Sequence, residues 1–464
     1  MSNPYQTESK FTAKTAVLSF QHMFAMFGAT VLVPILCNMS ISVALLAAGV
    51  GTICFYFITN RKVPVFLGSS FAFLPALQSC MAGTTIGTPE WNIQMGKAMV
   101  AVVLAGLVYV ILSLVIKQVG VKKVKRLFPP IVVGPVIIVI GMILAPKMFW
   151  NNIIGQAVWT GTPVWKEWTA AGITALSIVV VNAYAKPKSF LKVIPILMGF
   201  IVGYIYSLFI GLVDYSSCDW SKIVIFQDMQ TTFGFYNHLS FDAGTILAIV
   251  PLALVTFMEH LGDISANSMI CGKDFMVDPG VHKTVLGDGV ATMIAGCLGG
   301  PANTTYGENT AVLAITKNYN PKNIFYAACM AVVFGCFSVF GTAISTIPSA
   351  VIGGASIVLF GMISASGLRA LVDARVDFSN SKNLIVVSVV LAIGLGLGAM
   401  SLAGDITGDS SLKIMAGSVE LSPLAIATVV GIVLNLIIPN HKEEEDTEPA
   451  PLITVQTVVE EEEK

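Results

Sequence analysis

Long apolar stretches recur along nearly the whole chain, and they constrain its fold more than any other feature. Within residues 13–438, segments of about 17 to 25 mainly apolar residues follow one another with short polar connections. A helix of that length crosses the roughly 30 Å hydrocarbon layer of a bilayer. Charged residues make up only 11% of the 464 residues, too few to cover a soluble protein of this size. The sequence therefore predicts an all-α polytopic membrane protein, with fourteen spans.

The distribution of Lys and Arg predicts which side of the membrane each loop occupies. If the N-terminus is cytoplasmic, the outer loops of a fourteen-span chain hold only five of the 26 Lys and Arg residues: Lys97, Lys147, Lys166, Lys222 and Lys413. Loops that stay in the cytoplasm are the ones that carry excess positive charge. Both termini are therefore expected inside, and residues 441–464 are predicted to form an acidic, disordered cytoplasmic tail.

Composition and motif content argue against several classes of function. A formal net charge of −1 does not favour a nucleic-acid partner. The eight cysteines are scattered without a C-x-x-C pair or histidines at metal-ligand spacing, which indicates packing rather than metal binding. The chain has no nucleophile–base pair or phosphate loop at a meaningful spacing. We therefore expect no enzyme, no metal and no cofactor.

Two apolar segments resemble each other and suggest an internal repeat. PPIVVGPVIIVIGMILA at residues 129–145 shares P, V, G, I-V, GMI and A with PSAVIGGASIVLFGMISA at residues 348–365. These are predicted spans five and twelve, and a repeat of seven spans, an odd number, must place its two copies in opposite orientations. The alternative is convergence between two apolar helices, which draw on few residue types.

Two predicted spans are interrupted at matching positions of this repeat. Span three, at residues 66–82, contains LGSSFAFLPA, and span ten, at residues 304–316, lies in PANTTYGENTAVLAITK. A half-length helix that starts inside the membrane presents unpaired backbone N–H groups and the positive end of its dipole. Paired interruptions of this kind are the best sequence indication of a transporter binding site.

Few ionisable residues fall inside the predicted spans. They are His22, Glu259, His260, Asp263, Asp288 and Glu308. A charge at mid-bilayer costs about 2.5 to 3.5 kcal/mol even on lenient scales, so these side chains are expected to face protein, water or substrate. Glu259, Asp263 and Asn267 recur every four residues and so share one helix face, whereas His260 points about 100° away.

These carboxylates have a functional and a structural interpretation. Glu259 and Glu308 are predicted to accept hydrogen bonds from N–H groups of a solute or to exchange a proton, the alternative being that each braces a broken helix. Backbone donors and carboxylate acceptors together suit a small planar heterocycle with alternating C=O and N–H groups. Phe71, Phe73 and Tyr306 flank the interruptions and are candidates to stack on such a ring, or simply to pack.

Several motifs resemble those of a known family. They are QHMFAMFGATVLVP in span one, LGSSFAF in span three, EHLGD in span eight, GDGVATMIAGCLGG in span nine and ENTAVLAITK from residue 308. Along nearly its whole length the chain resembles the nucleobase/ascorbate transporters, the second class of nucleobase:cation symporters, and within them the uracil carriers. The resemblance implies a proton-coupled importer of uracil or a related nucleobase in the cytoplasmic (inner) membrane, usually a homodimer.

The resemblance also implies a fold, with seven plus seven inverted spans and short antiparallel strands in segments three and ten. Its core domain would comprise residues 1–120 and 241–345, and its gate domain residues 121–240 and 346–440, with alternating access between them. A xanthine or other purine carrier of the same family is the alternative. An anion channel or exchanger of the same architecture is a rival from another class, in which a cationic or neutral residue is expected in place of Glu308.

Carried over to this chain, the family pattern implies two sets of site residues. The substrate-binding set comprises Glu259, Glu308, Phe71, Gly307, Tyr306 and Ala29. The proton-coupling set comprises Glu308, Glu259, Asp263 and Asp288. Two positions depart from the pattern: Ala311 stands where Gly is typical, and Asp263 where some uracil carriers have His, so Asp263 is either the proton-linked group or its neighbour.

Overall fold

The computed structural model describes residues 13–120, 123, 129–186, 189–192, 194–215, 220–221, 223–416 and 419–439. The predicted acidic tail at residues 441–464 lies outside the described residues. The helices are α1 (Ala13–Leu36), α2 (Ile41–Ile58), α3 (Leu74–Met81), α4 (Pro89–Val119), α6 (Pro130–Phe149), α7 (Gly155–Thr160), α8 (Val164–Tyr184), α9 (Pro195–Phe209), α10 (Met229–Phe233), α11 (Ala243–Ile249), α12 (Leu252–Cys271), α13 (Val281–Leu298), α14 (Gly307–Thr316), α15 (Pro321–Cys336), α16 (Ser338–Ser345), α17 (Ser349–Asp373), α18 (Ser381–Thr407) and α19 (Pro423–Ile437). The strands are β1 (Leu67–Ser69), β2 (Asn303–Thr305), β3 (Met415–Ala416) and β4 (Val419–Glu420).

The helical membrane architecture predicted from hydropathy is present. Within the described residues, eight helices are long and apolar enough to cross a bilayer, and nine if α15 and α16, which meet at a 79° bend, count as one span. Two shorter apolar helices, α9 and α19, accompany them. Several helices are longer than a span of about 17 to 25 residues: α4 runs from Pro89 to Val119 and α18 from Ser381 to Thr407. Hydropathy marks only the apolar middle of a helix, and its polar ends continue past it.

The interruption predicted in two spans is a pair of antiparallel strands. β1 pairs with β2 in the register Leu67 to Thr305, Gly68 to Thr304 and Ser69 to Asn303. All six of these residues are buried, so the two strands meet inside the protein. This buried strand pair is called the strand crossing below. α3 follows β1 after a short connection, and α14 begins two residues after β2. The N-terminal ends of two short helices therefore lie next to the buried strand pair.

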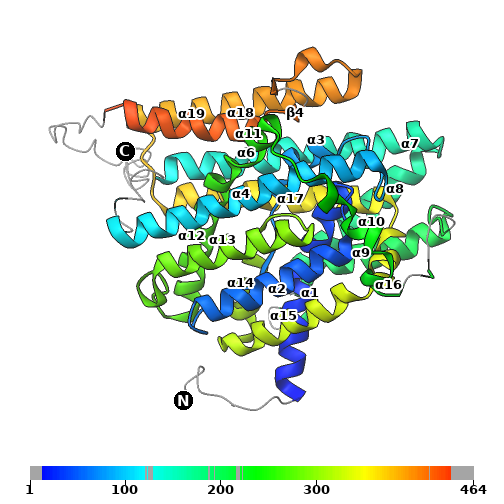
Figure 1. Ribbon diagram of the computed structural model, residues 1–464, viewed down its shortest axis with the longest axis horizontal. Helices are drawn as coiled ribbons and strands as arrows, with labels where there is room; N and C mark the ends of the chain where they lie inside the picture. Colours follow the sequence, from blue (N-terminus) through cyan, green and yellow to red (C-terminus); the bar gives the residue numbers. More distant parts are fainter. Residues whose placement is uncertain are drawn as a thin grey trace, which may run out of the picture.

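The long helices pack in two groups. α2 packs against α13 and α15, and α13 also packs against α4. In the second group α17 packs against α6 and α8, while α18 packs against α6 and α19. In Figure 1, α18 and α19 lie along the upper edge of the molecule and α15 along the lower edge. The connection between β1 and α3 lies between helices of both groups.

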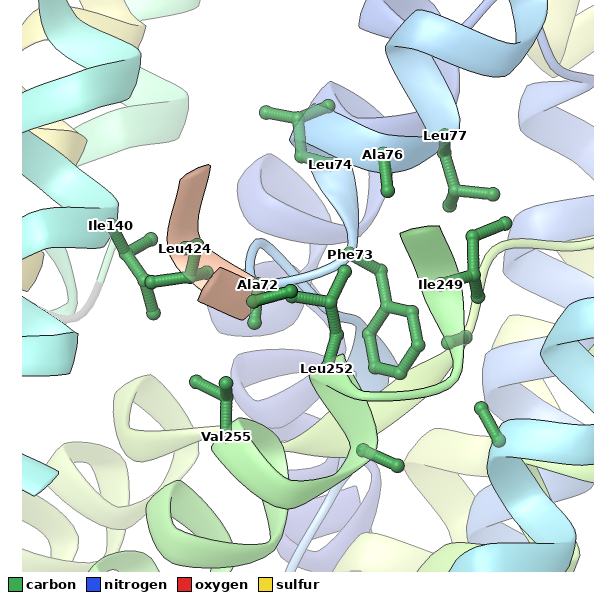
Figure 2. Packing of buried hydrophobic residues seen from close by; sticks show 14 of the residues in the cluster. Ala72, Phe73, Leu74, Ala76, Leu77, Ile140, Ile249, Leu252, Val255 and Leu424 are labelled. Carbon is green, nitrogen blue, oxygen red and sulfur yellow. The ribbon is translucent and has the colours of Figure 1, made fainter. Parts of the chain in front are cut away.

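Figure 2 shows this connection at close range, in an apolar cluster of buried side chains. Phe73 lies beside Leu252 and Ile249, at the start of α12 and in α11. Ala72 lies nearer to Ile140 of α6 and Leu424 of α19, on the opposite side of the connection. Because apolar residues of α11 and α12 on one side and of α6 and α19 on the other enclose this connection, the entrance to α3 is fixed by packing on both sides.

Helices α6 and α17 approach each other closely, and their crossing depends on glycine. A Cβ atom built on Gly141 would lie 2.1 Å from the Phe360 carbonyl oxygen and 2.2 Å from Ser364 Oγ. The obstructing carbonyl belongs to a helix backbone and cannot turn aside. Gly141→Ala is therefore expected to lower the melting temperature in detergent by several degrees, through overpacking of about 1–3 kcal/mol. Gly172→Ala in α8, where nothing lies within 4 Å of the new Cβ, is the control and should be neutral or stabilising. An unchanged melting temperature for Gly141→Ala would contradict the crossing.

Candidate functional site

The candidate site is built around the residue that follows β2. Tyr306 is buried, and its amide donates to the Phe66 carbonyl at 3.1 Å. Its hydroxyl donates to the Ser69 carbonyl at 2.8 Å and accepts from Thr30 Oγ1 at 3.2 Å. One side chain thus ties the end of β2 to β1 and to α1. The tyrosine that the sequence marked as a candidate stacking residue also holds the strand crossing together.

Two backbone amides beside the crossing are left without acceptors. Among the described residues, neither the Phe71 amide nor the Gly307 amide donates a hydrogen bond. Gly307 is the first residue of α14 and is exposed, so its N–H is one of the unpaired donors at a helix N-terminus. Phe71 and Gly307 both belong to the substrate-binding set that the family resemblance implies. Both can donate to carbonyl oxygens of a bound solute.

Three carboxylates gather next to these amides. Glu259 and Asp263 lie one turn apart on α12, Glu308 lies in the first turn of α14, and all three are partly exposed. They are close enough to repel one another electrostatically. No ion pair between described residues involves any of the three. Their mutual repulsion makes the site attractive to a proton, to another cation or to N–H donors.

Asp288, the fourth carboxylate of the predicted proton-coupling set, is more deeply buried than the other three. Asp288 on α13 is fully buried, and its Oδ2 lies 3.1 Å from His260 Nδ1 on α12. His260 Nε2 in turn lies 3.0 Å from Thr284 Oγ1. The helix therefore turns Glu259 and Asp263 to one face and His260 to the α13 side, as the helical spacing predicts. Asp288 joins α12 to α13 and does not line the same face as the other three.

Apolar side chains surround the strand crossing. Ala29 from α1 is buried in the same cluster as Tyr306, and Phe71 packs against that cluster. The Phe71 ring meets Phe360 of α17 edge to face, with centroids 5.6 Å apart and planes at 86°. Ala29 and Phe71 therefore both lie beside the strand crossing. Phe360 contributes from α17, a helix of the other packing group.

Two asparagines near the carboxylates, Asn309 and Asn267, make hydrogen bonds that join neighbouring elements. Asn309 Nδ2 donates to the His22 carbonyl at 2.9 Å and lies 3.3 Å from His22 Nδ1, which joins α14 to α1. Asn267 shares one face of α12 with Glu259 and Asp263. It is buried and donates to the Pro64 carbonyl at 3.1 Å. Along this face of α12, the partly exposed carboxylates of Glu259 and Asp263 are therefore followed by a buried side chain that binds the backbone.

Sequence reasoning missed one residue of the site, Thr305. The Thr305 hydroxyl donates to Asp263 Oδ2 at 2.7 Å. Thr305 was not among the predicted site residues. The alternation of a strand would have placed its side chain opposite that of Tyr306, but the helix on that face could not be known from the sequence.

The chain is similar to known proteins along most of its length. Residues 13–402 match a family model described as a permease family. The uracil permease of Bacillus caldolyticus is 42% identical over 429 residues, which cover 91% of the chain and 92% of that protein. The uracil permease of Bacillus subtilis (strain 168) is 41% identical over 432 residues, covering 92% of the chain and 93% of that protein.

A solved structure shares the fold at low sequence identity. The transmembrane domain of the cyanobacterial bicarbonate transporter BicA aligns with a TM-score of 0.61 and 15% identity. The alignment covers 84% of this chain and 97% of that one. At this identity the likeness concerns the architecture alone, and the chemistry of the site must come from the residues of this chain.

Proposed function

The chain belongs to the nucleobase/ascorbate transporter family and is a multi-pass membrane transporter rather than an enzyme, and from this premise we propose that it imports uracil by proton symport. The proposal places it in the cytoplasmic membrane with both termini in the cytoplasm. Uracil is the preferred substrate because the relatives that match along more than nine-tenths of the chain are named uracil permeases.

The unpaired amides beside partly exposed carboxylates are the observation that carries the proposal. Uracil presents two carbonyl oxygens and two ring N–H groups at its edge. The Phe71 and Gly307 amides suit its carbonyl oxygens, and the Glu259 and Glu308 carboxylates suit its N–H groups. Tyr306 and Ala29 would form apolar walls beside the ring. In a site largely out of water, such matched donors and acceptors discriminate strongly against solutes that leave one of them unpaired.

Proton coupling is proposed for the carboxylate group as a whole. Three mutually repelling carboxylates that form no ion pair with another described residue are costly to keep ionised together, so entry of a proton relieves the repulsion. Glu308 and Glu259 are the proposed coupling groups, with Asp263 beside them. Asp288 is proposed as a further member, acting through its contact with His260.

Alternating access is proposed to occur between the two packing groups. The group of α2, α4, α13 and α15 corresponds to the proposed core at residues 1–120 and 241–345, and the group of α6, α8, α17 and α18 to the proposed gate at residues 121–240 and 346–440. The matching strand and short-helix pairs β1 with α3 and β2 with α14 support a fourteen-segment inverted repeat. A homodimer in the bilayer completes the proposal.

A purine such as xanthine is the alternative substrate within the family. An anion substrate is disfavoured, although the bicarbonate transporter BicA shares the fold, because the site presents three carboxylates. Like charges would repel an anion from a site of low dielectric.

Uptake of radiolabelled uracil into a uracil-transport-deficient bacterium tests substrate and coupling together. The expected result is uptake that depends on expression of the chain, increases as the external medium is acidified and collapses with a protonophore. Unlabelled uracil should compete strongly and xanthine weakly. Stronger competition by xanthine would assign the purine alternative, and uptake that ignores both pH gradient and protonophore would refute proton coupling. Sodium replacement of the proton would appear as a requirement for external Na⁺.

A further inference from the structure

Thr305 occupies a singular position between the strand crossing and the carboxylates. It is the last residue of β2, it is buried, and its hydroxyl donates to Asp263 Oδ2 at 2.7 Å. The other oxygen of the same carboxylate, Oδ1, lies 3.7 Å from where a Cβ on Gly307 would be. Asp263 therefore faces both the end of β2 and the start of α14.

Several side-chain hydrogen bonds fix β2 and the residue after it. Asn303 Nδ2 donates to the carbonyls of Ala47 at 3.2 Å and Ala291 at 3.3 Å. The Tyr306 hydroxyl donates to the Ser69 carbonyl at 2.8 Å. Both of these end on backbone oxygens, which have the same charge at any pH. The Thr305 hydrogen bond differs from them because its acceptor is an ionisable group.

We propose that Thr305 is a positioning residue that couples the proton occupancy of Asp263 to the affinity of the substrate site. The inference rests on the proposed function. A hydroxyl binds an ionised carboxylate roughly twice as strongly as a neutral acceptor, so the Thr305 bond is strongest when Asp263 is charged. That bond fixes the backbone two residues before Gly307, whose amide is a proposed substrate donor. Protonation of Asp263 weakens the bond and releases this backbone, which lowers the affinity of the site for substrate. By linkage, a bound substrate lowers the proton affinity of Asp263 by the same factor.

Asp263 is surrounded by other carboxyl groups that shape its titration. Glu259 on its own helix and Glu308 on α14 lie on the same side as Asp263, and Asp288 on α13 repels it from the opposite side of α12. His260, also on α12, is directed to Asp288. The pH dependence of binding thus has several contributors, and the contribution of Thr305 must be isolated as a ratio between matched variants.

The test measures the dissociation constant of uracil for the purified full-length chain, from about pH 5.5 to about pH 8. Thr305→Val keeps the shape of the side chain and removes the donor, whereas Thr305→Ser keeps the donor. We expect Thr305→Val to raise Kd about tenfold at the alkaline end, where Asp263 is charged, and by less toward the acid end. Thr305→Ser should stay within about twofold throughout. If Thr305→Val does not yield monodisperse protein, Thr305→Ala replaces it.

A double-mutant cycle separates positioning from simple packing. In the Asp263→Asn background the acceptor is neutral at every pH, so the Kd ratio produced by Thr305→Val should fall to about threefold and no longer change with pH. A ratio that is the same at all pH values in the unaltered background, or equal in both backgrounds, overturns the Thr305 link and leaves the proposed function standing. A chain that binds no uracil at all overturns the proposed function and with it this inference.

Discussion

Replacing Glu308 by Gln is expected to weaken uracil binding by about 10- to 100-fold and to abolish concentrative uptake. Glu308 lies in the first turn of α14, one residue after the unpaired Gly307 amide. The substitution keeps the size of the side chain but removes the negative charge and one of two acceptor oxygens. A hydrogen bond to a charged acceptor is worth about 1.5 to 3 kcal/mol, which gives the expected range of affinity loss. The same change removes a group that could carry a proton.

Equilibrium binding and uptake together assign the role of Glu308. The matched control is Glu90→Gln, because Glu90 also lies in the first turn of a helix, α4, but is exposed and outside the site. The control should retain both binding and uptake. If Glu308→Gln binds uracil with native affinity, Glu308 is not a substrate acceptor. If it binds weakly but still accumulates uracil against a gradient, Glu308 is not required for proton coupling.

The sequence could predict the broad plan of the site because that plan depends on local pattern. Interruptions in spans three and ten predicted breaks at the positions of β1 and β2 and short helices after them. Helical spacing placed Glu259 and Asp263 on one face and His260 on another. The strand pairing itself came from the family resemblance, since hydropathy alone cannot distinguish a broken helix from two crossing strands.

What the sequence could not predict is which polar side chains meet across helices. The proximity of His260 to Asp288, and the bonds of Thr305 to Asp263 and of Asn267 to Pro64, depend on how α12 packs against α13, β2 and the loop before β1. Periodicity gives the direction of a side chain but not its partner. As a result, Thr305 was overlooked, and Asn267 was grouped with carboxylates although it braces a backbone.

Gly68→Ala is expected to fold but to lose most uracil binding, because the strand crossing has no room for a methyl group. A Cβ on Gly68 would lie 2.5 Å from Thr30 Oγ1 and 2.5 Å from Cε2 of Tyr306. Neither neighbour can yield freely, since the Tyr306 hydroxyl is bonded both to Thr30 and to the Ser69 carbonyl. Overpacking of this kind costs about 1–3 kcal/mol and is relieved here by shifting β2.

A shift of β2 would displace the Gly307 amide and the Glu308 carboxylate, which follow it closely in the chain. The substrate-binding groups would then be misplaced although the protein still folds. We expect the Kd of uracil to rise at least about tenfold while the variant remains monodisperse and its helical content is retained. Gly172→Ala, with open space around the new methyl group, should leave Kd unchanged and shows that an added methyl group is not itself harmful. Native affinity in Gly68→Ala would mean that the substrate does not depend on the strand crossing, and the site would have to be sought away from Tyr306 and Gly307.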